Sequence, residues 1–363
     1  MQAVVLVGGE GTRLRPLTYG TPKPMVPIFG VPFLERTLSR LYEAGIDHAI
    51  LAAGYLPEAI TKHLGDGSRL GMRLTYVIEE SPLGTAGALR NVANHITGPF
   101  FVLNGDIMTS LDLGAMIRFH REKGGLGALH LIRVEDPSAF GCVPHDENGR
   151  IRSFVEKPPR ETAPTNEVNA GTYLLEREVL DAIPPGRMVS IERETFPQLL
   201  ASGAALYAYT TGDYWIDIGR PEHYEKIHRD VLDRRLTLGP LADATAHRGE
   251  FYLSGSFPPA GVLAPSYLGE GVTLDEGATA GPHTVLGDRV SVGPRAVVSD
   301  SILWDGVIVE EGAIVRGAIV ASGARIGRGA AVEPGTVIGH DAVIPPNAVV
   351  PRDARITAEV PVS

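Results

Sequence analysis

Cysteine is almost absent from this sequence, which has one, Cys142, among 363 residues. A single cysteine excludes an intrachain disulfide, and the opening residues MQAVVLV lack the positive charge and the cleavage site of a secretory leader. We therefore expect a cytoplasmic protein. No run of about 18 apolar residues occurs, so no membrane span is expected either.

Positive charge is also scarce, with a formal net charge of -10. This balance removes the bulk attraction to nucleic acid or to an anionic membrane, so neither is expected as a partner, and any polyanion that binds should be small. Lysine is the rarer cation, with 5 residues against 28 arginines, which gives weight to the positions of Lys23 and Lys157. Hydrophobic residues at 44% and a length that suits two domains indicate a folded globular protein.

Short apolar runs alternate with helical periodicity over residues 1–238. Strands are predicted at 3–7, 48–53, 73–78 and 100–104, and helices at 32–44, 57–64, 84–94 and 112–123. Another helix is predicted to start at Pro221 and to close the domain. This order favours an α/β fold with a Rossmann-like, mixed but mostly parallel sheet, which binds ligands at the carboxyl ends of its strands.

Residues 239–261 are rich in glycine and proline and are predicted to be a linker. From residue 262 to 363 the period changes to six, with one break in frame near SILWDG. A short strand and a turn repeated at this period stack into a parallel β-helix whose leading residues form an interior ladder. The pattern resembles the hexapeptide repeat of left-handed β-helices, which predicts a homo-oligomer assembled through this domain. The leading residues are Val262, Leu268, Leu274, Ala280, Leu286, Val292, Val298, Val320, Ile326, Val332, Ile338, Ile344 and Val350.

The strongest chemical motif follows the first predicted strand, where QAVVLV continues into GGEGTRLRPLTYGTPKPMVP. Glycines let the backbone approach a phosphate and expose its N–H groups, so Gly8, Gly9 and Gly11 are candidates for binding a triphosphate. Arg13 and Lys23 supply the cations that such a ligand needs. The Walker A and dinucleotide motifs are both incomplete here.

Six motifs together resemble the nucleotide-sugar pyrophosphorylase family of sugar-1-phosphate nucleotidyltransferases along the whole chain. They are GGxGTRLxPLTxxxPKPMxP (8–27), SPLGTAGAL (81–89), LNGDI (103–107), FVEKP (154–158), VNAGTY (168–173) and YWIDIG (214–219). The resemblance implies transfer of a nucleotide from NTP to a sugar 1-phosphate, with release of pyrophosphate. It implies catalytic roles for Arg13, Lys23 and Lys157, and nucleotide binding by the first motif and by Thr12, Glu79, Gly84, Thr85 and Asp106.

The resemblance also implies that the sugar phosphate is bound by Gly141, Glu156, Lys157 and Asn169. Two carboxylates can be assigned from their own chemistry, because Asp106 follows a predicted strand and Asp217 lies in another apolar segment. Carboxylates that meet at a sheet edge suit Mg²⁺, which takes one or two of them together with phosphate oxygens. We therefore expect Mg²⁺ as the cofactor, although each aspartate could instead serve as a turn or cap residue.

Guanine offers two adjacent donors that a carboxylate complements, whereas thymine and uracil suit an amide. Glu79 and Glu80 precede SPLGTAG, which favours GTP, and the resemblance is closest to mannose-1-phosphate guanylyltransferases. A thymidylyl- or uridylyltransferase acting on glucose 1-phosphate is the alternative. Two other functions are also considered: that of a non-catalytic regulatory paralogue, and acyl transfer with His283 or His340 as the base. Each of these histidines is more simply explained as a solvent-facing turn residue.

Overall fold

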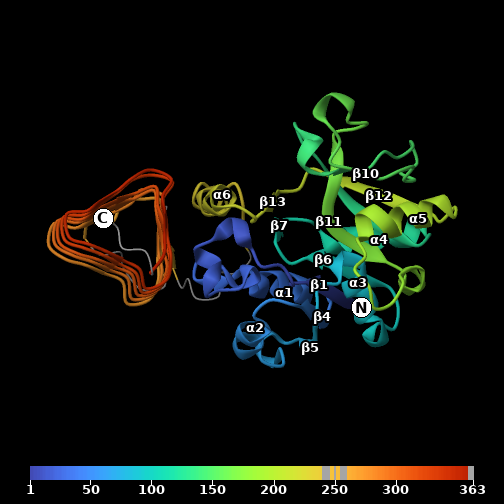
Figure 1. Ribbon diagram of the computed structural model, residues 1–363, viewed down its shortest axis with the longest axis horizontal. Helices are drawn as coiled ribbons and strands as arrows, with labels where there is room; N and C mark the ends of the chain where they lie inside the picture. The colour runs from blue at the N-terminus through green and yellow to red at the C-terminus, as the bar shows by residue number, and fades with distance from the viewer. Residues whose placement is uncertain (239–245, 249–250, 254–259, 359–363) are drawn as a thin grey trace. The chain divides into compact units, whose positions relative to one another are not determined.

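The computed structural model describes residues 1–238, 246–248, 251–253 and 260–358 (Figure 1). The chain divides into two compact units, one of Met1–Gly9 with Thr37–Ile216 and one of Glu10–Arg36 with Asp217–Ser363. The segment that carries most of the first motif thus clusters with the C-terminal part of the chain, a grouping that the sequence did not predict. Of the predicted linker, 246–248 and 251–253 form strands, 260 and 261 are also described, and the rest lies outside the described residues.

Four parallel strands form one half of the sheet in the first unit. β1 (Gln2–Leu6) lies between β4 (His48–Ala53) and β6 (Phe100–Asn104), and β4 pairs with β5 (Arg73–Ile78). All six residues of β4 are buried, as expected for a strand covered on both faces. The predicted strands are confirmed, with β1 displaced by one residue.

The other half of the sheet is mixed. β11 (Glu167–Leu175) is antiparallel to both β6 and β8 (Gly127–Arg133), and β12 (Leu206–Thr211) is parallel to β8. Short strands β9 (Gly141–Cys142) and β10 (Val155–Glu156) extend the edge of the sheet beyond β11. A separate pair is formed by β7 (Ile107–Thr109) and β13 (Trp215–Asp217). The mixed, mostly parallel sheet is therefore confirmed.

The predicted helices are present as α1 (Phe33–Glu43), α2 (Pro57–Leu64), α3 (Gly84–Asn91) and α4 (Leu113–Lys123). α3 is three residues shorter than predicted and gives way to a 3₁₀ turn at Ala93–His95. α4 begins one residue later because Asp112 is its cap, with a side chain that accepts a hydrogen bond from Ala115 N at 2.9 Å. α5 (Phe196–Ala201) packs on the sheet and follows a π-helical segment, Ile191–Thr195.

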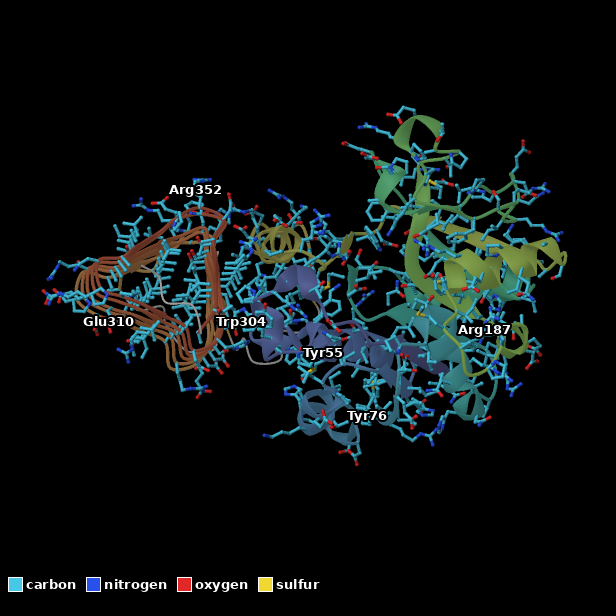
Figure 2. All side chains as sticks on the ribbon, viewed as in Figure 1. Tyr55, Tyr76, Arg187, Trp304, Glu310 and Arg352 are labelled. Atoms are coloured by element: carbon cyan, nitrogen blue, oxygen red, sulfur yellow. The ribbon has the colours of Figure 1, made fainter. Side chains whose placement is uncertain are left out.

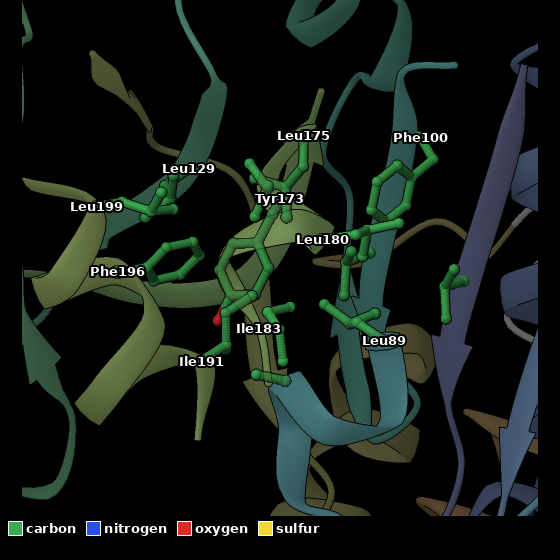
Figure 3. Close-up of a cluster of buried hydrophobic side chains, with 14 of the residues drawn as sticks. Leu89, Phe100, Leu129, Tyr173, Leu175, Leu180, Ile183, Ile191, Phe196 and Leu199 are labelled. Carbon is green, nitrogen blue, oxygen red and sulfur yellow. The ribbon is translucent and has the colours of Figure 1, made fainter. Parts of the chain in front are cut away.

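The main core of the first unit is centred on Tyr173 of β11 (Figure 3). Its ring meets that of Phe196 edge-on, with centroids 5.1 Å apart, and both side chains are fully buried. Burying a side chain of this size contributes about 1.5–3 kcal/mol, so this cluster fixes β11 against α5. β11 also carries Asn169, one of the predicted site residues.

The second unit contains a hairpin of β2 (Pro27–Ile28) and β3 (Val31–Pro32), the helix α6 (Pro221–Leu232) and a three-sided β-helix, whose coils are orange to red in Figure 1. α6 starts at Pro221 as predicted.

The β-helix consists of three sheets of mostly parallel strands, as a left-handed hexapeptide-repeat fold requires. The first sheet has β14 (Ala246–Arg248), β15 (Phe251–Leu253), β16 (Ser266–Leu268), β19 (Thr284–Leu286), β22 (Ile302–Leu303), β25 (Ile319–Val320), β28 (Val337–Ile338) and β31 (Arg355–Ile356), of which only β14 is antiparallel to its neighbour. The second has β17 (Thr273–Leu274), β20 (Ser291–Val292), β23 (Ile308–Val309), β26 (Arg325–Ile326) and β29 (Val343–Ile344), and the third β18 (Thr279–Ala280), β21 (Val297–Ser299), β24 (Ile314–Arg316), β27 (Ala331–Val332) and β30 (Val349–Val350).

The interior ladder of the β-helix is confirmed, but its frame breaks twice rather than once. Leu303, Val309 and Val315 are at most 1% exposed and continue the ladder through the stretch that looked irregular. The repeat shortens by one residue between Val298 and Leu303, and again between Val315 and Val320. Each shortened repeat shifts the frame by one residue, so Leu303, Val309 and Val315 keep the spacing of six but are out of frame with the ladder on either side. This shift is why the stretch looks irregular in the sequence.

Candidate active site

The start of the glycine-rich motif lies at the carboxyl end of β1, as predicted for a ligand-binding loop. Gly8 lies against the turn after β4, since a Cβ at Gly8 would come 3.7 Å from Gly54 N. Gly9 is exposed, and a Cβ there would meet nothing within 4 Å. The backbone at Gly8 and Gly9 is therefore accessible to a ligand.

Glu79 lies in the same unit, directly after β5, and is the better placed of the two glutamates in its segment. Its side chain is half-buried, whereas Glu80 is exposed. Oε2 of Glu79 accepts a hydrogen bond from Leu83 N at 3.2 Å, just before Gly84 and Thr85 begin α3. Burial raises the pKa of the Glu79 carboxyl, and the Leu83 N–H offsets this rise in part. The carboxylate is thus held facing a predicted nucleotide-binding turn.

The remainder of the first motif folds so that its third glycine touches its lysine. Gly11 has a φ of +63°, and a Cβ there would come 2.9 Å from Lys23 Cβ, so only glycine fits. Thr18 Oγ1 donates to Gly11 O at 2.9 Å and closes the loop. Thr12 is exposed at the start of a 3₁₀ turn, and Lys23 is 7% exposed.

Two predicted cations converge on one predicted metal ligand in the second unit. Lys23 Nζ lies 3.5 Å from Asp217 Oδ1, and Arg13 Nη2 lies 3.8 Å from Asp217 Oδ2. A Cβ at Gly219 would come 2.8 Å from Asp217 Oδ1 and 2.6 Å from Arg13 Nη2, so glycine is needed for these two side chains to lie so close to the backbone. Arg13, Lys23 and Asp217 are therefore brought together, although more than 190 residues separate Lys23 from Asp217.

The Asp217 carboxylate suits a cation that is shared with a bound phosphate. Its side chain is 27% exposed, at the end of β13. In the described part of the chain, no three His, Cys, Asp or Glu side chains are grouped to hold a metal on their own. A partly exposed carboxylate is a ligand of the kind that Mg²⁺ combines with phosphate oxygens. Asp106 lies in the turn after β6, in the other unit, so its partnership with Asp217 stays a prediction.

Three of the four residues predicted to bind the sugar phosphate meet at the edge formed by β9 and β10, and the fourth, Asn169, lies in β11. Gly141 pairs with Glu156 across these strands, and a Cβ at Gly141 would come 2.9 Å from Glu156 Oε2. Lys157 follows with a φ of 49°, and its N–H donates to Phe140 O at 2.9 Å. Glu156 Oε1 lies 3.8 Å from Lys157 Nζ and also 3.8 Å from a guanidinium nitrogen of Arg193.

Arg193 is a candidate site residue that the sequence did not single out. It lies in the segment SIERETFP, where alternating charge reads as a solvated helix face. In the structure its guanidinium and Lys157 form a pair of cations around Glu156, with side chains 64% and 57% exposed. Two accessible cations beside one carboxylate can bind a phosphate while the carboxylate accepts hydrogen bonds from hydroxyl groups.

A chain of hydrogen bonds joins Thr85, Glu192, Tyr173 and Asn169, and we call it the polar relay. Thr85 Oγ1 donates to Glu192 Oε2 at 3.0 Å, and Tyr173 OH donates to Glu192 Oε1 at 3.3 Å. Asn169 Nδ2 donates to Tyr173 OH at 2.7 Å, and Asn169 Oδ1 accepts from Gly171 N at 3.1 Å. The relay therefore links a predicted nucleotide-binding residue to a predicted sugar-binding residue, and both use their side chains to hold it.

The VNAGTY motif produces an irregularity in β11 that shapes this region. The register between β11 and β8 shifts between Asn169 and Tyr173. Gly171 has a φ of +70°, and a Cβ there would come 2.6 Å from Asn104 Nδ2. Glycine is thus required, both for the bulge and for the approach of Asn104 at the end of β6.

His283 and His340 are partly buried and contact other segments, whereas the simpler reading of the sequence had them facing solvent. His283 Nε2 lies 2.7 Å from Asp233 Oδ1, next to the end of α6. His340 Nε2 lies 3.1 Å from Leu17 O and 3.2 Å from Thr21 Oγ1. Both contacts are inside the second unit and are made to segments outside the β-helix.

Comparisons with known proteins identify the family. The family model described as nucleotidyl transferase matches residues 2–234, and the one described as GMPPB C-terminal domain matches residues 262–362. The chain belongs to the nucleotidyl transferase family, whose members of this kind generally use a divalent metal ion. It is therefore a transferase. No helix in the described ranges is long and apolar enough to cross a membrane.

The chain is similar to several characterised relatives. It is 45% identical to the mannose-1-phosphate guanylyltransferase of Mycobacterium tuberculosis over 78% of this chain and 77% of that protein. It is 33% identical to the UTP–glucose-1-phosphate uridylyltransferase of Synechocystis over 76% of each chain. Among solved structures, HddC from Yersinia pseudotuberculosis complexed with GMP-PN matches with a TM-score of 0.54 and 32% identity, covering 62% of this chain and 96% of that one.

Proposed function

We propose that this protein makes GDP-mannose and pyrophosphate from GTP and mannose 1-phosphate. The observation that carries the proposal is the convergence of Arg13 and Lys23 on Asp217, with Lys23 buried in the motif that resembles a nucleotide-binding signature. The similarity to the mycobacterial guanylyltransferase supports this choice of base and sugar. Cys142 is a buried free thiol, which fits the cytoplasmic location that we also propose.

The reaction requires two anions to meet, because a phosphate oxygen of the sugar attacks the α-phosphorus of the triphosphate. Like unit charges about 4 Å apart cost about 4 kcal/mol at an effective dielectric constant near 20, and several such pairs form. Arg13 and Lys23 offset this repulsion on the triphosphate, while the N–H groups of Gly8, Gly9 and Gly11 bind its oxygens. Orientation of the attack in line with the leaving pyrophosphate supplies the remaining rate enhancement.

Asp106 and Asp217 are the residues that we propose to hold Mg²⁺. When bound, the ion neutralises charge on the phosphate oxygens and on the leaving group. Asp217 carries a second role, because its carboxylate orients Lys23 and Arg13 before the substrate arrives. These cations can then turn from the carboxylate to the phosphates.

We propose that Lys157 and Arg193 bind the phosphate of the sugar, and that Glu156 accepts hydrogen bonds from sugar hydroxyls. Gly141 keeps open the space beside Glu156, and Asn169 is held by the polar relay at the neighbouring strand. No general base is needed, since the attacking phosphate is already ionised at neutral pH. The site thus positions and neutralises rather than moving protons.

Glu79 is the residue that we propose to select guanine, with Gly84 and Thr85 completing the turn that it faces. Because burial raises the pKa of the Glu79 carboxyl, this group becomes protonated at a higher pH than an exposed glutamate. As the pH is lowered, the affinity for GTP should therefore begin to fall at that higher pH. Glu79→Gln should lower kcat/KM for GTP about tenfold, raise it for UTP or dTTP and remove that pH dependence. Glu80→Gln, at the exposed neighbour, is the matched control. An unchanged preference for GTP in Glu79→Gln contradicts the assignment.

The direct test is pyrophosphate release with Mg²⁺ from GTP, dTTP, UTP and ATP, each combined with mannose 1-phosphate and with glucose 1-phosphate. Preference for GTP with mannose 1-phosphate supports the proposal. Turnover of UTP or dTTP with glucose 1-phosphate favours the alternative thymidylyl- or uridylyltransferase. No turnover in any combination, from protein that still binds nucleotide, favours a regulatory paralogue.

We also propose a homo-oligomer formed through the β-helix. Its third sheet presents an outward row of apolar side chains in register, formed by Val297, Ile314, Ala331 and Val349. Val349 is 65% exposed while its neighbour Val350 is fully buried in the ladder. Val349→Glu should lower the mass measured by light scattering if this face is an interface, and an unchanged oligomeric mass excludes it.

A further inference from the structure

The first sheet of the β-helix is buried on its inner and its outer surface, whereas the outer surfaces of the second and third sheets carry exposed side chains. On the first sheet, the outward side chains of Val285, Ile302 and Ile319 are only 3%, 3% and 4% exposed. On the second and third sheets, the outward Val343 and Val349 are 60% and 65% exposed. Something inside the second unit therefore covers the first sheet. Figure 2 shows Trp304 on this side of the coil and Glu310 on another.

Part of the cover is the segment that precedes Lys23 in the glycine-rich motif. His340 Nε2 lies within hydrogen-bond distance of Leu17 O, at 3.1 Å, and of Thr21 Oγ1, at 3.2 Å. The backbone of Gly339 also lies close to the Pro16 ring, because a Cβ at Gly339 would come 3.1 Å from Pro16 Cβ. The β-helix thus binds the motif on the N-terminal side of its buried lysine.

The C-terminal side of the same motif is held through α6. Trp304 Nε1 donates to Tyr224 OH at 3.0 Å, and Tyr224 OH donates to Pro27 O at 2.5 Å. Trp304 also packs against His340, with ring centroids 5.4 Å apart. One cluster of side chains therefore contacts the motif at Leu17, Thr21 and Pro27, before and after Lys23.

We propose that the β-helix is a positioning element of the nucleotide site, and that His340 and Trp304 are its positioning residues. By fixing the motif at both ends, they hold Lys23 where the triphosphate binds, without touching the substrate themselves. This inference rests on the proposed function, because it takes the motif to be the triphosphate site. It gives the β-helix a role inside each chain that is separate from assembly.

The experiment compares three variants of the full-length protein. His340→Phe keeps an aromatic ring against Trp304 but loses the hydrogen bond made by Nε2, and His340→Gln keeps an amide donor. His283→Phe is the matched control, because it breaks a contact of the same β-helix with Asp233 and leaves the motif alone. Two quantities are measured for each variant: amide hydrogen exchange of residues 16–29 in the free protein, and KM for GTP and for mannose 1-phosphate.

His340→Phe should raise both the exchange of residues 16–29 and the KM for GTP about fivefold, the effect of losing one hydrogen bond, while KM for the sugar phosphate changes little. His340→Gln should recover most of both losses, and His283→Phe should show neither. Unchanged exchange in His340→Phe, or an equal rise of both KM values, overturns the inference. The exchange measurement does not depend on turnover, so it still tests the positioning if wild-type protein converts no GTP and the proposed function fails.

Discussion

Tyr173→Phe removes one fully buried oxygen from the middle of the polar relay and keeps the ring against Phe196. The hydroxyl accepts from Asn169 Nδ2 at 2.7 Å and donates to Glu192 at 3.3 Å. Losing a neutral hydrogen bond and a long one to a charged group costs about 2 kcal/mol in all. If that energy holds Asn169 at the sugar, KM for mannose 1-phosphate should rise up to about 30-fold.

The assay is the initial rate of pyrophosphate release with each substrate varied in turn. Tyr76→Phe is the matched control in the same unit, because it also removes one hydroxyl, which donates to Gly65 O at 2.6 Å away from these residues. We expect Tyr76→Phe to leave both KM values unchanged. A Tyr173→Phe enzyme whose KM for the sugar phosphate stays within twofold of wild type refutes the reasoning, since Asn169 would then be placed without the relay.

Two further predictions concern single residues of the site. Asp217→Asn should abolish most turnover even at saturating Mg²⁺, because it removes both the proposed metal ligand and a partner of the buried Lys23. Intact turnover, measured by pyrophosphate release, contradicts the metal assignment. Gly141→Ala should raise KM for the sugar phosphate at least tenfold while KM for GTP stays constant, because its Cβ would lie 2.7 Å from the Phe154 ring and 2.9 Å from Glu156 Oε2. Equal effects on both KM values would instead indicate a general loss of fold.

The sequence singled out candidate site residues that belong to short motifs. It did not single out candidates that are brought to the site only by contacts between distant segments. The glycine-rich pattern singled out Gly11, and the resemblance supplied Gly141 and the role of Lys157; their functions stay predictions. Arg193 and Glu192 could not be found, because SIERETFP has no periodicity that distinguishes a site residue from a solvated helix face. Their contacts with Glu156 and Tyr173 form only when β10 and β11 fold next to that segment.

A similar limit applies to the β-helix, although here the sequence contained a usable signal. The period of six identifies the inward ladder because each leading residue must fill the same interior, whichever sheet it belongs to. Outward positions differ between sheets: the first carries Tyr267, Val285, Ile302 and Ile319, while the second carries Thr273, Ser291 and Arg325 among its members. An apolar outward residue in every third repeat therefore marks a candidate contact face, which is covered within the unit on the first sheet and exposed on the third. The pattern does not identify the partner of the first sheet, because nothing in LTYGTPKPMVPIF indicates that it packs on residues more than 280 positions later.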